Sequence, residues 1–202
     1  MTTHITSDTH LGHVNVIELS ERPFPDVGAM NMALIERWNE RVQDGDTVYH
    51  LGDVVLGKTS ETLPLVGLLN GYKILLSGNH DRAWHGHRKT GTWEQRYRDA
   101  GFDEVITDAY EAQSIMVGDR RVLICHFPYD GDHTEQVRFE EHRLPDDGHT
   151  WLLHGHSHGA LGRQHGRQID VGVDAWGGRP ASLTEIAEII DGGPGHLDVL
   201  PW

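Results

Sequence analysis

The sequence predicts an α/β fold in which two packed sheets are flanked by helices. Three observations predict it. Short apolar runs recur along the chain, and each is followed at once by a cluster of polar residue types that bind metals. Helical patterns alternate with these runs in the first half, as in crossover βαβ units. In the second half strand-like runs lie close together, and a short glycine-containing turn joins two of them, as in a hairpin.

Five apolar runs have the length and composition of buried strands. They span residues 4–7, 47–51, 74–77, 122–125 and 151–154. The clusters that follow them are Asp8-Thr9-His10, Gly52-Asp53, Gly78-Asn79-His80-Asp81, His126 and Gly155-His156-Ser157-His158. Because α/β folds place their sites at the carboxyl ends of neighbouring strands, we expect these side chains to converge at one edge.

The remaining elements are predicted from periodicity and capping signals. Helices are expected over residues 26–42, 60–69, 92–100 and 182–190, with Ser60 and Ser182 as N-caps and Glu185 at capping-box spacing. Further strands are expected over residues 104–107, 112–117, 121–126 and 168–173, with Gly118-Asp119-Arg120 as the hairpin turn. The tail over residues 192–202 is expected to be packed or frayed, without a function.

The ligand types in the clusters indicate a metal site. Carboxylates, an amide and imidazoles, with no thiolate, suit two first-row divalent cations that share a bridging carboxylate. A single Gly-Asp pair is common by chance. Five clusters in order, each after a strand-like run, are not, so we reject the alternative that they are unrelated turn residues.

In their order, the five clusters resemble the signature of calcineurin-like metallophosphoesterases: Asp-x-His, Gly-Asp, Gly-Asn-His-(Asp/Glu), His and Gly-His-x-His. The chain is most similar to the small bacterial and phage phosphoesterases of that superfamily, whose opening resembles residues 6–17 and 21–24 and whose ending resembles residues 171–176, 179–180 and 182–183. The resemblance runs from about Thr3 to about Ile190. It implies a four-layer α/β/β/α sandwich of two mixed sheets, formed by a single domain over residues 1–202.

The resemblance also implies a role for each matching residue. One metal ion would be held by Asp8, His10 and His158. The second would be held by Asn79, His126 and His156, and Asp53 would bridge the two ions. The two ions would be divalent transition metals from the set Mn, Fe, Zn, Ni and Co, with Mn or Fe favoured.

His80 resembles the family histidine that faces the substrate without binding metal and protonates the leaving oxygen. Asp81 is expected to hydrogen-bond His80 and fix its tautomer. His13, Asn15, Arg22 and Arg82 are candidate substrate-binding residues; for the two arginines, ordinary surface salt bridges are an open alternative.

A polar segment over residues 129–150 joins two of the ligand-bearing strands. It has two interpretations, a solvated surface loop or a lid over the site. His133, His142 and His149 within it are expected to be solvated. His50 and His154 precede metal motifs inside strands, and alternation places them in the core.

The amino-acid composition limits the classes of partner that the protein is expected to bind. The 202 residues carry a formal net charge of −14, with 31 acidic and 17 basic residues, which disfavours a long nucleic acid as the main partner. No apolar run approaches the roughly 18 residues of a membrane span. Because the first residues read as a strand, we expect no signal peptide, and we expect the single cysteine, Cys125, to pack in the core of a protein in a reducing cytoplasm.

The sequence thus predicts a cytoplasmic binuclear phosphoesterase. It would hydrolyse P–O bonds of small phosphomonoesters or phosphodiesters, such as a nucleotide or cyclic phosphate, through a metal-bridging hydroxide. One alternative is a metal-dependent nuclease that acts on nucleic-acid ends. A second is a non-catalytic protein-binding module of the same fold, which should have lost ligands that this chain retains.

Overall fold

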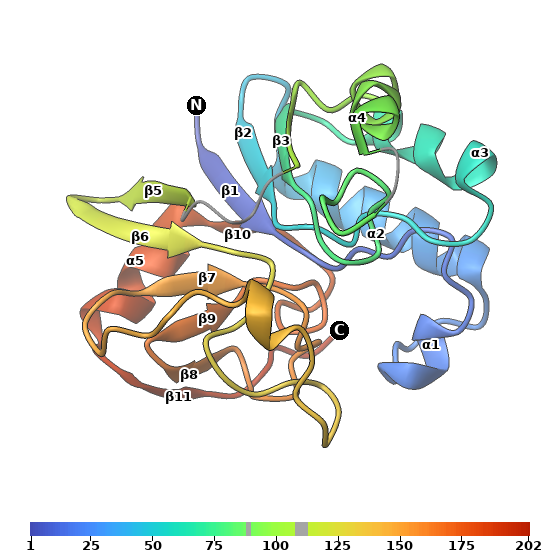
Figure 1. The fold of residues 1–202 in the computed structure, drawn as a ribbon. Coiled ribbons are helices and arrows are strands. Elements are labelled where there is room, and N and C mark those ends of the chain that lie inside the picture. Colours follow the sequence, from blue (N-terminus) through green and yellow to red (C-terminus); the bar gives the residue numbers. More distant parts are fainter. Residues whose placement is uncertain (88–89, 108–112) are drawn as a thin grey trace.

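Two mixed sheets form the centre of the protein in a computed structural model that describes residues 1–87, 90–107 and 113–202 (Figure 1). Five α-helices accompany the sheets within these ranges. The helices are α1 (Val16–Leu19), α2 (Val27–Arg41), α3 (Thr59–Thr62), α4 (Thr90–Asp99) and α5 (Leu183–Asp191). The predicted α/β class with two mixed sheets is confirmed.

The first sheet has the strand order β10-β1-β2-β3-β4. Its strands are β10 (Ala181–Ser182), β1 (Thr3–Thr6), β2 (Thr47–His50), β3 (Tyr72–Leu76) and β4 (Glu104–Ile106). β1 to β4 run parallel, and β10 pairs antiparallel with β1. Thr6 pairs with His50 and His50 with Leu75, so the three central strands are in level register. The segments after them therefore leave the sheet at one edge.

The second sheet has the order β11-β8-β9-β7-β6-β5. Its strands are β11 (Gly195–Leu197), β8 (Gln164–Gly166), β9 (Gln168–Asp170), β7 (Leu152–His154), β6 (Arg120–Ile124) and β5 (Gln113–Val117). β6, β7 and β9 run parallel, with Ile124, Leu153 and Ile169 in line. A bridge between Ser7 and Gly172 joins the end of β1 to the segment after β9, which brings the ligand-bearing edges of the two sheets together.

Apolar side chains fill the space between the sheets. Ile5 from the first sheet and Leu153 and Ile169 from the second are fully buried in one cluster. α5 adds Ile186 to this cluster and contacts β1, β10 and β5. β7 is buried at every position, which explains why its residues belong to a mainly apolar run in the sequence.

Helices α2 and α4 pack against the first sheet through a second apolar cluster. Met30 and Leu34 of α2 and Tyr97 of α4 are buried there with Leu75 of β3. Asp26 caps α2 by accepting the Ala29 N–H at 2.8 Å, at the start of the helix that the sequence predicts over residues 26–42. Within the described ranges, every helix falls short of the length and hydropathy that a membrane-spanning helix requires.

Several local predictions are confirmed by the structure. Ser182 and Glu185 form the expected capping box at the start of α5. β5 and β6 form the expected hairpin, with Val117 paired to Arg120 around a two-residue turn. The predicted strand began at Ala112, which lies outside the described residues.

The helix predicted over residues 60–69 is wrong in detail. It divides into α3 and the 3₁₀ helix η1 (Leu63–Leu68), and its N-cap is Lys58 rather than Ser60. Pro64 lies at the start of η1, where its missing N–H ends the α-helical ladder. The tail is also more regular than expected, because it adds β11 to the second sheet.

Candidate metal centre

Five of the seven predicted metal ligands lie on left-handed backbone. The φ angles are 55° at Asp8, 48° at His10, 59° at Asp53, 66° at His156 and 49° at His158. Non-glycine residues seldom adopt such angles. Each residue that does so costs about 1–3 kcal/mol of conformational energy and keeps this conformation only where the surrounding structure holds it. The strand ends are therefore strained where the ligands stand, which is typical of functional sites.

Two glycines of the motifs permit the close approach of neighbouring segments. A Cβ atom at Gly155 would lie 2.3 Å from Asp8 Oδ2, and one at Gly78 would lie 2.4 Å from Asp53 Oδ1. Neither position can carry a side chain without displacing a carboxylate. The spacing of glycine and ligand in the Gly-Asn-His and Gly-His-x-His motifs therefore has a steric reason.

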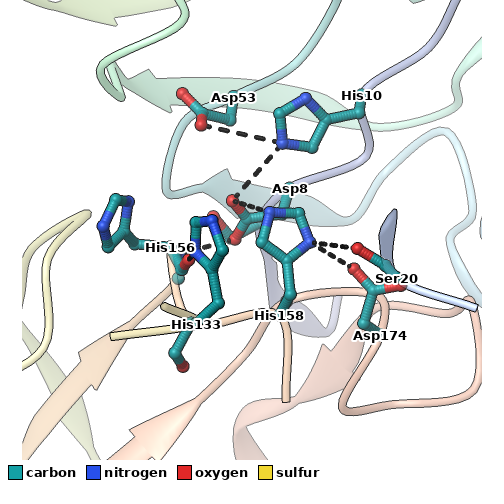
Figure 2. A network of polar contacts seen from close by, with 12 residues as sticks. Asp8, His10, Ser20, Asp53, His133, His156, His158 and Asp174 are labelled. Atoms are coloured by element: carbon teal, nitrogen blue, oxygen red, sulfur yellow. Dashed lines mark hydrogen bonds and ion pairs between the residues drawn. The ribbon is translucent and has the colours of Figure 1, made fainter. Parts of the chain in front are cut away.

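Asp8, His10 and His158 form one group of candidate metal ligands (Figure 2). His10 Nε2 lies 3.8 Å from Asp8 Oδ1, and His158 Nε2 lies 3.9 Å from the same oxygen. Among the described residues, Asp8 Oδ1 and His10 Nε2 have no hydrogen-bond partner although both are buried. Buried polar atoms are rarely left unpaired, so this group fits a cation.

Asn79, His126 and His156 converge beside the first group. Asn79 Oδ1 lies 3.1 Å from His126 Nε2 and 3.1 Å from His156 Nδ1. His126 Nδ1 donates to the Leu51 carbonyl at 2.7 Å, which leaves Nε2 as a lone-pair donor toward the site. All three side chains thus direct ligand atoms at a common point.

Asp53 stands between the two groups. Its Oδ2 atom lies 3.7 Å from His10 Nε2 and 3.5 Å from His126 Nε2. Its Oδ1 atom accepts the backbone N–H of His80 at 2.8 Å. The structure therefore brings all seven predicted ligand residues together, in two groups with Asp53 shared.

His158 is supported by a buried carboxylate that the sequence did not identify. Its Nδ1 contacts Asp174 Oδ2 at 2.7 Å, and Arg22 binds both oxygens of Asp174 at 2.8 Å. Burial lowers the pKa of His158, but the hydrogen bond to Asp174 and the charges of Asp8 and Asp174 outweigh burial and raise it to about 9. Asp174 lies in the segment 171–176 that carries the family resemblance, and this was its only signal.

The prediction that Arg22 binds substrate is corrected by its position. Its side chain has 0% exposure and is also bound to the carbonyls of Asp8 and Thr9 at 2.8 and 3.0 Å. A guanidinium with these partners has no face left for a ligand. Arg22 instead fixes the backbone of the Asp-x-His motif and the Asp174 carboxylate.

His80 is the most exposed member of the motif residues, with 45% of its side chain accessible. Its Nε2 lies 3.9 Å from Asp53 Oδ2, beside the centre. The expected hydrogen bond from Asp81 to His80 is not formed in the structure. Asp81 accepts the N–H groups of Asp53 at 2.7 Å and Gly78 at 2.9 Å, so it joins the ends of β2 and β3.

Two cavities border His80. One of about 470 Å³ is lined by His10, His13, His80, Arg138 and His158 among others. The other, of about 450 Å³, is lined by Asn79, His80, Arg82 and Trp93 among others. His13 and Arg82 therefore lie where the sequence prediction needs them. Asn15 is exposed and is absent from the described lining of both cavities.

The segment 129–150 contains a carboxylate and a histidine that contact the centre. His133, expected to be solvated, donates from Nδ1 to the His156 carbonyl at 2.8 Å, and its ring centroid lies 5.2 Å from that of His158. Asp132 is buried and contacts His156 Nε2 at 3.2 Å. No periodicity or spacing in this polar segment could have identified either residue.

Two further histidine predictions agree with the structure. His50 is buried, with Nε2 at 3.0 Å from Thr9 Oγ1, and His154 is buried with Nδ1 at 2.8 Å from the Gly155 carbonyl. Cys125 is likewise buried, in a cluster with Trp84, Phe127 and Leu152. These residues form the core beneath the site.

Comparison with known families decides the identity of this fold. The calcineurin-like phosphoesterase superfamily domain matches residues 1–176. The chain belongs to this superfamily. The gene 66 protein of Mycobacterium phage D29 is 40% identical over 178 residues, which cover 85% of this chain and 87% of the relative. The gene 66 protein of Mycobacterium phage L5 is 36% identical over 203 residues, covering 94% of each chain.

A solved structure also matches this calcineurin-like phosphoesterase. A protein of unknown function from Aquifex aeolicus superposes with a TM-score of 0.67 at 23% identity, covering 93% of this chain and 98% of its own. At that identity the match shows the shared fold. The family resemblance inferred from the five clusters is confirmed.

Proposed function

We propose that this superfamily member is a binuclear metal-dependent phosphoesterase that hydrolyses small phosphate esters. One observation carries the proposal: two groups of buried ligand atoms, with Asp8 Oδ1 and His10 Nε2 unpartnered among the described residues, meet at the shared carboxylate of Asp53. Superfamily membership supports hydrolysis of phosphate esters as the chemistry.

The residues present fit two ions. Asp8, His10 and His158 would hold one, Asn79, His126 and His156 the other, and Asp53 both. When bound, such ions supply Lewis-acid activation of water and neutralise charge on the phosphate. Oxygen and imidazole ligands of these types accept Mn, Fe, Zn, Ni or Co, and among these ions we propose Mn or Fe.

His80 is proposed as the general acid. Its side chain reaches the cavities while its backbone N–H is fixed on Asp53 Oδ1 at 2.8 Å. An imidazole so placed can give a proton to the leaving oxygen. Asp81 acts on this step indirectly, because it fixes the backbone of Gly78 and Asp53 beside His80 rather than the ring itself.

The proposed substrate is a small mono- or diester. The net charge of −14 means that the surface outside the site repels long polyanions. The volume of each of the two cavities lies in the range of about 300–1,000 Å³ that is usual for small-molecule sites. A nuclease that trims nucleic-acid ends is the second candidate. The same cavities and Arg82 at the rim would also admit a strand terminus.

The test combines metal content with a substrate panel. Elemental analysis of the loaded enzyme should approach two ions per chain. Mono-, di- and cyclic phosphate esters and short DNA and RNA should then be compared with Mn²⁺ present. Asp53→Asn should weaken both metal-binding steps, whereas His10→Ala should weaken mainly one. One ion or fewer with full activity would contradict the binuclear proposal, and faster turnover of nucleic acid than of every small ester would favour the nuclease.

A further inference from the structure

The imidazole of His156 is held at both nitrogens. Nδ1 faces Asn79 Oδ1 at 3.1 Å, and Nε2 contacts Asp132 Oδ2 at 3.2 Å. The His156 backbone is fixed as well, because its N–H donates to Asp8 Oδ2 at 2.9 Å. Only 2% of the side chain is exposed, so the ring has little room to rotate.

Asp132 is a fixed, charged acceptor. Its side chain has 0% exposure, and it accepts from Arg138 Nη2 at 2.9 Å and from Arg143 Nη2 at 3.4 Å. The backbone N–H groups of His133 and Arg138 donate to it at 2.8 and 3.1 Å. These N–H donors hold the carboxylate in place, so that Oδ2 faces His156 Nε2 in a fixed position.

Arg143 closes the segment around Asp132. Its guanidinium donates to the carbonyls of Gly131 at 2.7 Å and Arg138 at 3.1 Å, and only 6% of its side chain is exposed. Residues 128–143 are therefore tied to one another and to the site. This arrangement supports a fixed wall for this part of the segment rather than a swinging lid.

We propose that Asp132 is a positioning residue for the second metal site, where it accepts the Nε2–H of His156 and thereby presents Nδ1 beside Asn79. A histidine that binds metal through one nitrogen must carry its proton on the other, so an acceptor at Nε2 selects the required tautomer. The inference rests on the proposed function. It adds a residue that the five motifs do not contain.

Asp132, His133 and His156 could also be taken as a third cation site, since their ligand atoms lie close together. Two arginines on the same carboxylate oppose this. Cation binding there would require at least one guanidinium to leave. The positioning role requires none of the observed contacts of Asp132 to break.

The experiment is a two-step Mn²⁺ titration of metal-free protein by calorimetry, with Asp132→Asn against wild type. Outer contacts of this kind are worth about 10- to 100-fold in metal affinity. The second-site affinity should fall by that factor while the first-site affinity stays within about twofold. Asp130→Asn is the matched control, because it removes the same charge two residues away, where the side chain faces Gln168 instead. Equal affinities in Asp132→Asn and wild type would overturn the inference.

A second readout does not depend on metal. Long-range ¹⁵N spectra of the metal-free protein, with the His156 signal assigned through His156→Gln, should show the Nε2–H tautomer in wild type and its loss in Asp132→Ala. An unchanged tautomer would overturn the inference even where the metal titration is ambiguous. If Asp132→Asn fails to fold, the double variant Asp132→Asn with Arg138→Met removes one of the uncompensated arginines and carries the same test. Failure of wild type to bind two ions would instead count against the proposed function.

Discussion

His156 and His158 lie two residues apart, yet the carboxylates that hold them come from different kinds of structure. Asp174 is bound by Arg22, which lies 152 positions away in the chain and has 0% side-chain exposure. Asp132 is bound by Arg138 and Arg143, which lie 6 and 11 positions away, and Arg138 is 35% exposed. The first support is part of the core, whereas the second is made by one loop.

This difference predicts how far the effect of a substitution extends in each support. Arg22 also binds the carbonyls of Asp8 and Thr9, so its loss affects the start of the chain, the Asp174 segment and the ligand backbone at once. Loss of Arg138 leaves Asp132 with Arg143 and with two backbone donors. We expect defects in the first support to appear as instability and defects in the second as altered metal binding.

The largest expected effect lies outside both supports and serves as their reference. His80→Ala should lower kcat by about 10²- to 10⁴-fold, the usual contribution of a general acid, while both metal-binding steps remain. The loss should be smaller for p-nitrophenyl esters than for alkyl esters, because nitrophenolate needs little protonation. Steady-state kinetics on the two ester types measures this. Equal losses for both would remove the general-acid role.

The second prediction compares the arginines directly. Arg22→Met should lower the free energy of unfolding by about 3–5 kcal/mol, since it leaves a buried carboxylate without its main partner. Arg138→Met should cost about 1 kcal/mol or less, because the residue is partly exposed and a second arginine remains. Urea denaturation in a chelating buffer gives both values. Equal losses in the free energy of unfolding would show that the loop contributes as much to stability through Asp132 as the core does through Asp174.

The third prediction concerns which of the two metal sites a substitution weakens. Asp174→Asn should weaken the first-site affinity by about 10- to 100-fold through His158 and leave the second site near its wild-type value. The expected pattern is thus the opposite of that for Asp132→Asn. Calorimetric titration of the two variants side by side checks it. If both variants weaken the same step, the division of the histidines between two ions is wrong.

The smallest expected effect concerns the motion of the loop. Cys125 lies beneath residues 127–144 and packs with Phe127, Phe139 and Leu144. Burial raises its pKa to about 11, so a thiol reagent at neutral pH should react slowly with native protein. Arg143→Met should increase the labelling rate about tenfold or less, by loosening the loop, without unfolding the chain. Rapid labelling of wild type would instead favour a lid that opens.

The sequence predicted the convergence of the site because strand-end position is a local property. The level register of Thr6, His50 and Leu75 then brings the following residues to one edge. Their roles as ligands stay predictions. The helix at residues 60–69 was predicted less well, because the prediction relied on Ser60 as an N-cap and did not account for the interruption by Pro64.

Partners set by tertiary contacts could not be predicted. Asp81 follows His80 directly, which suggested a bond between them, but its carboxylate turns toward the backbone of Asp53 and Gly78. Arg22 was predicted to bind substrate, with a surface salt bridge as the alternative, whereas Asp174 holds it in the interior. Asp132 lies in a polar segment whose contacts arise only once both sheets have met.

The left-handed backbone at Asp8, His10, Asp53, His156 and His158 has a consequence for how this protein would respond to selection. Glycine adopts these angles without strain, and asparagine does so more readily than histidine. At each of the five positions, the residue that best suits the chain is therefore one that removes or weakens a ligand. A library screened for thermal stability alone should accumulate glycine and asparagine there. The most thermally stable variants from such a screen should be folded proteins that no longer bind their ions.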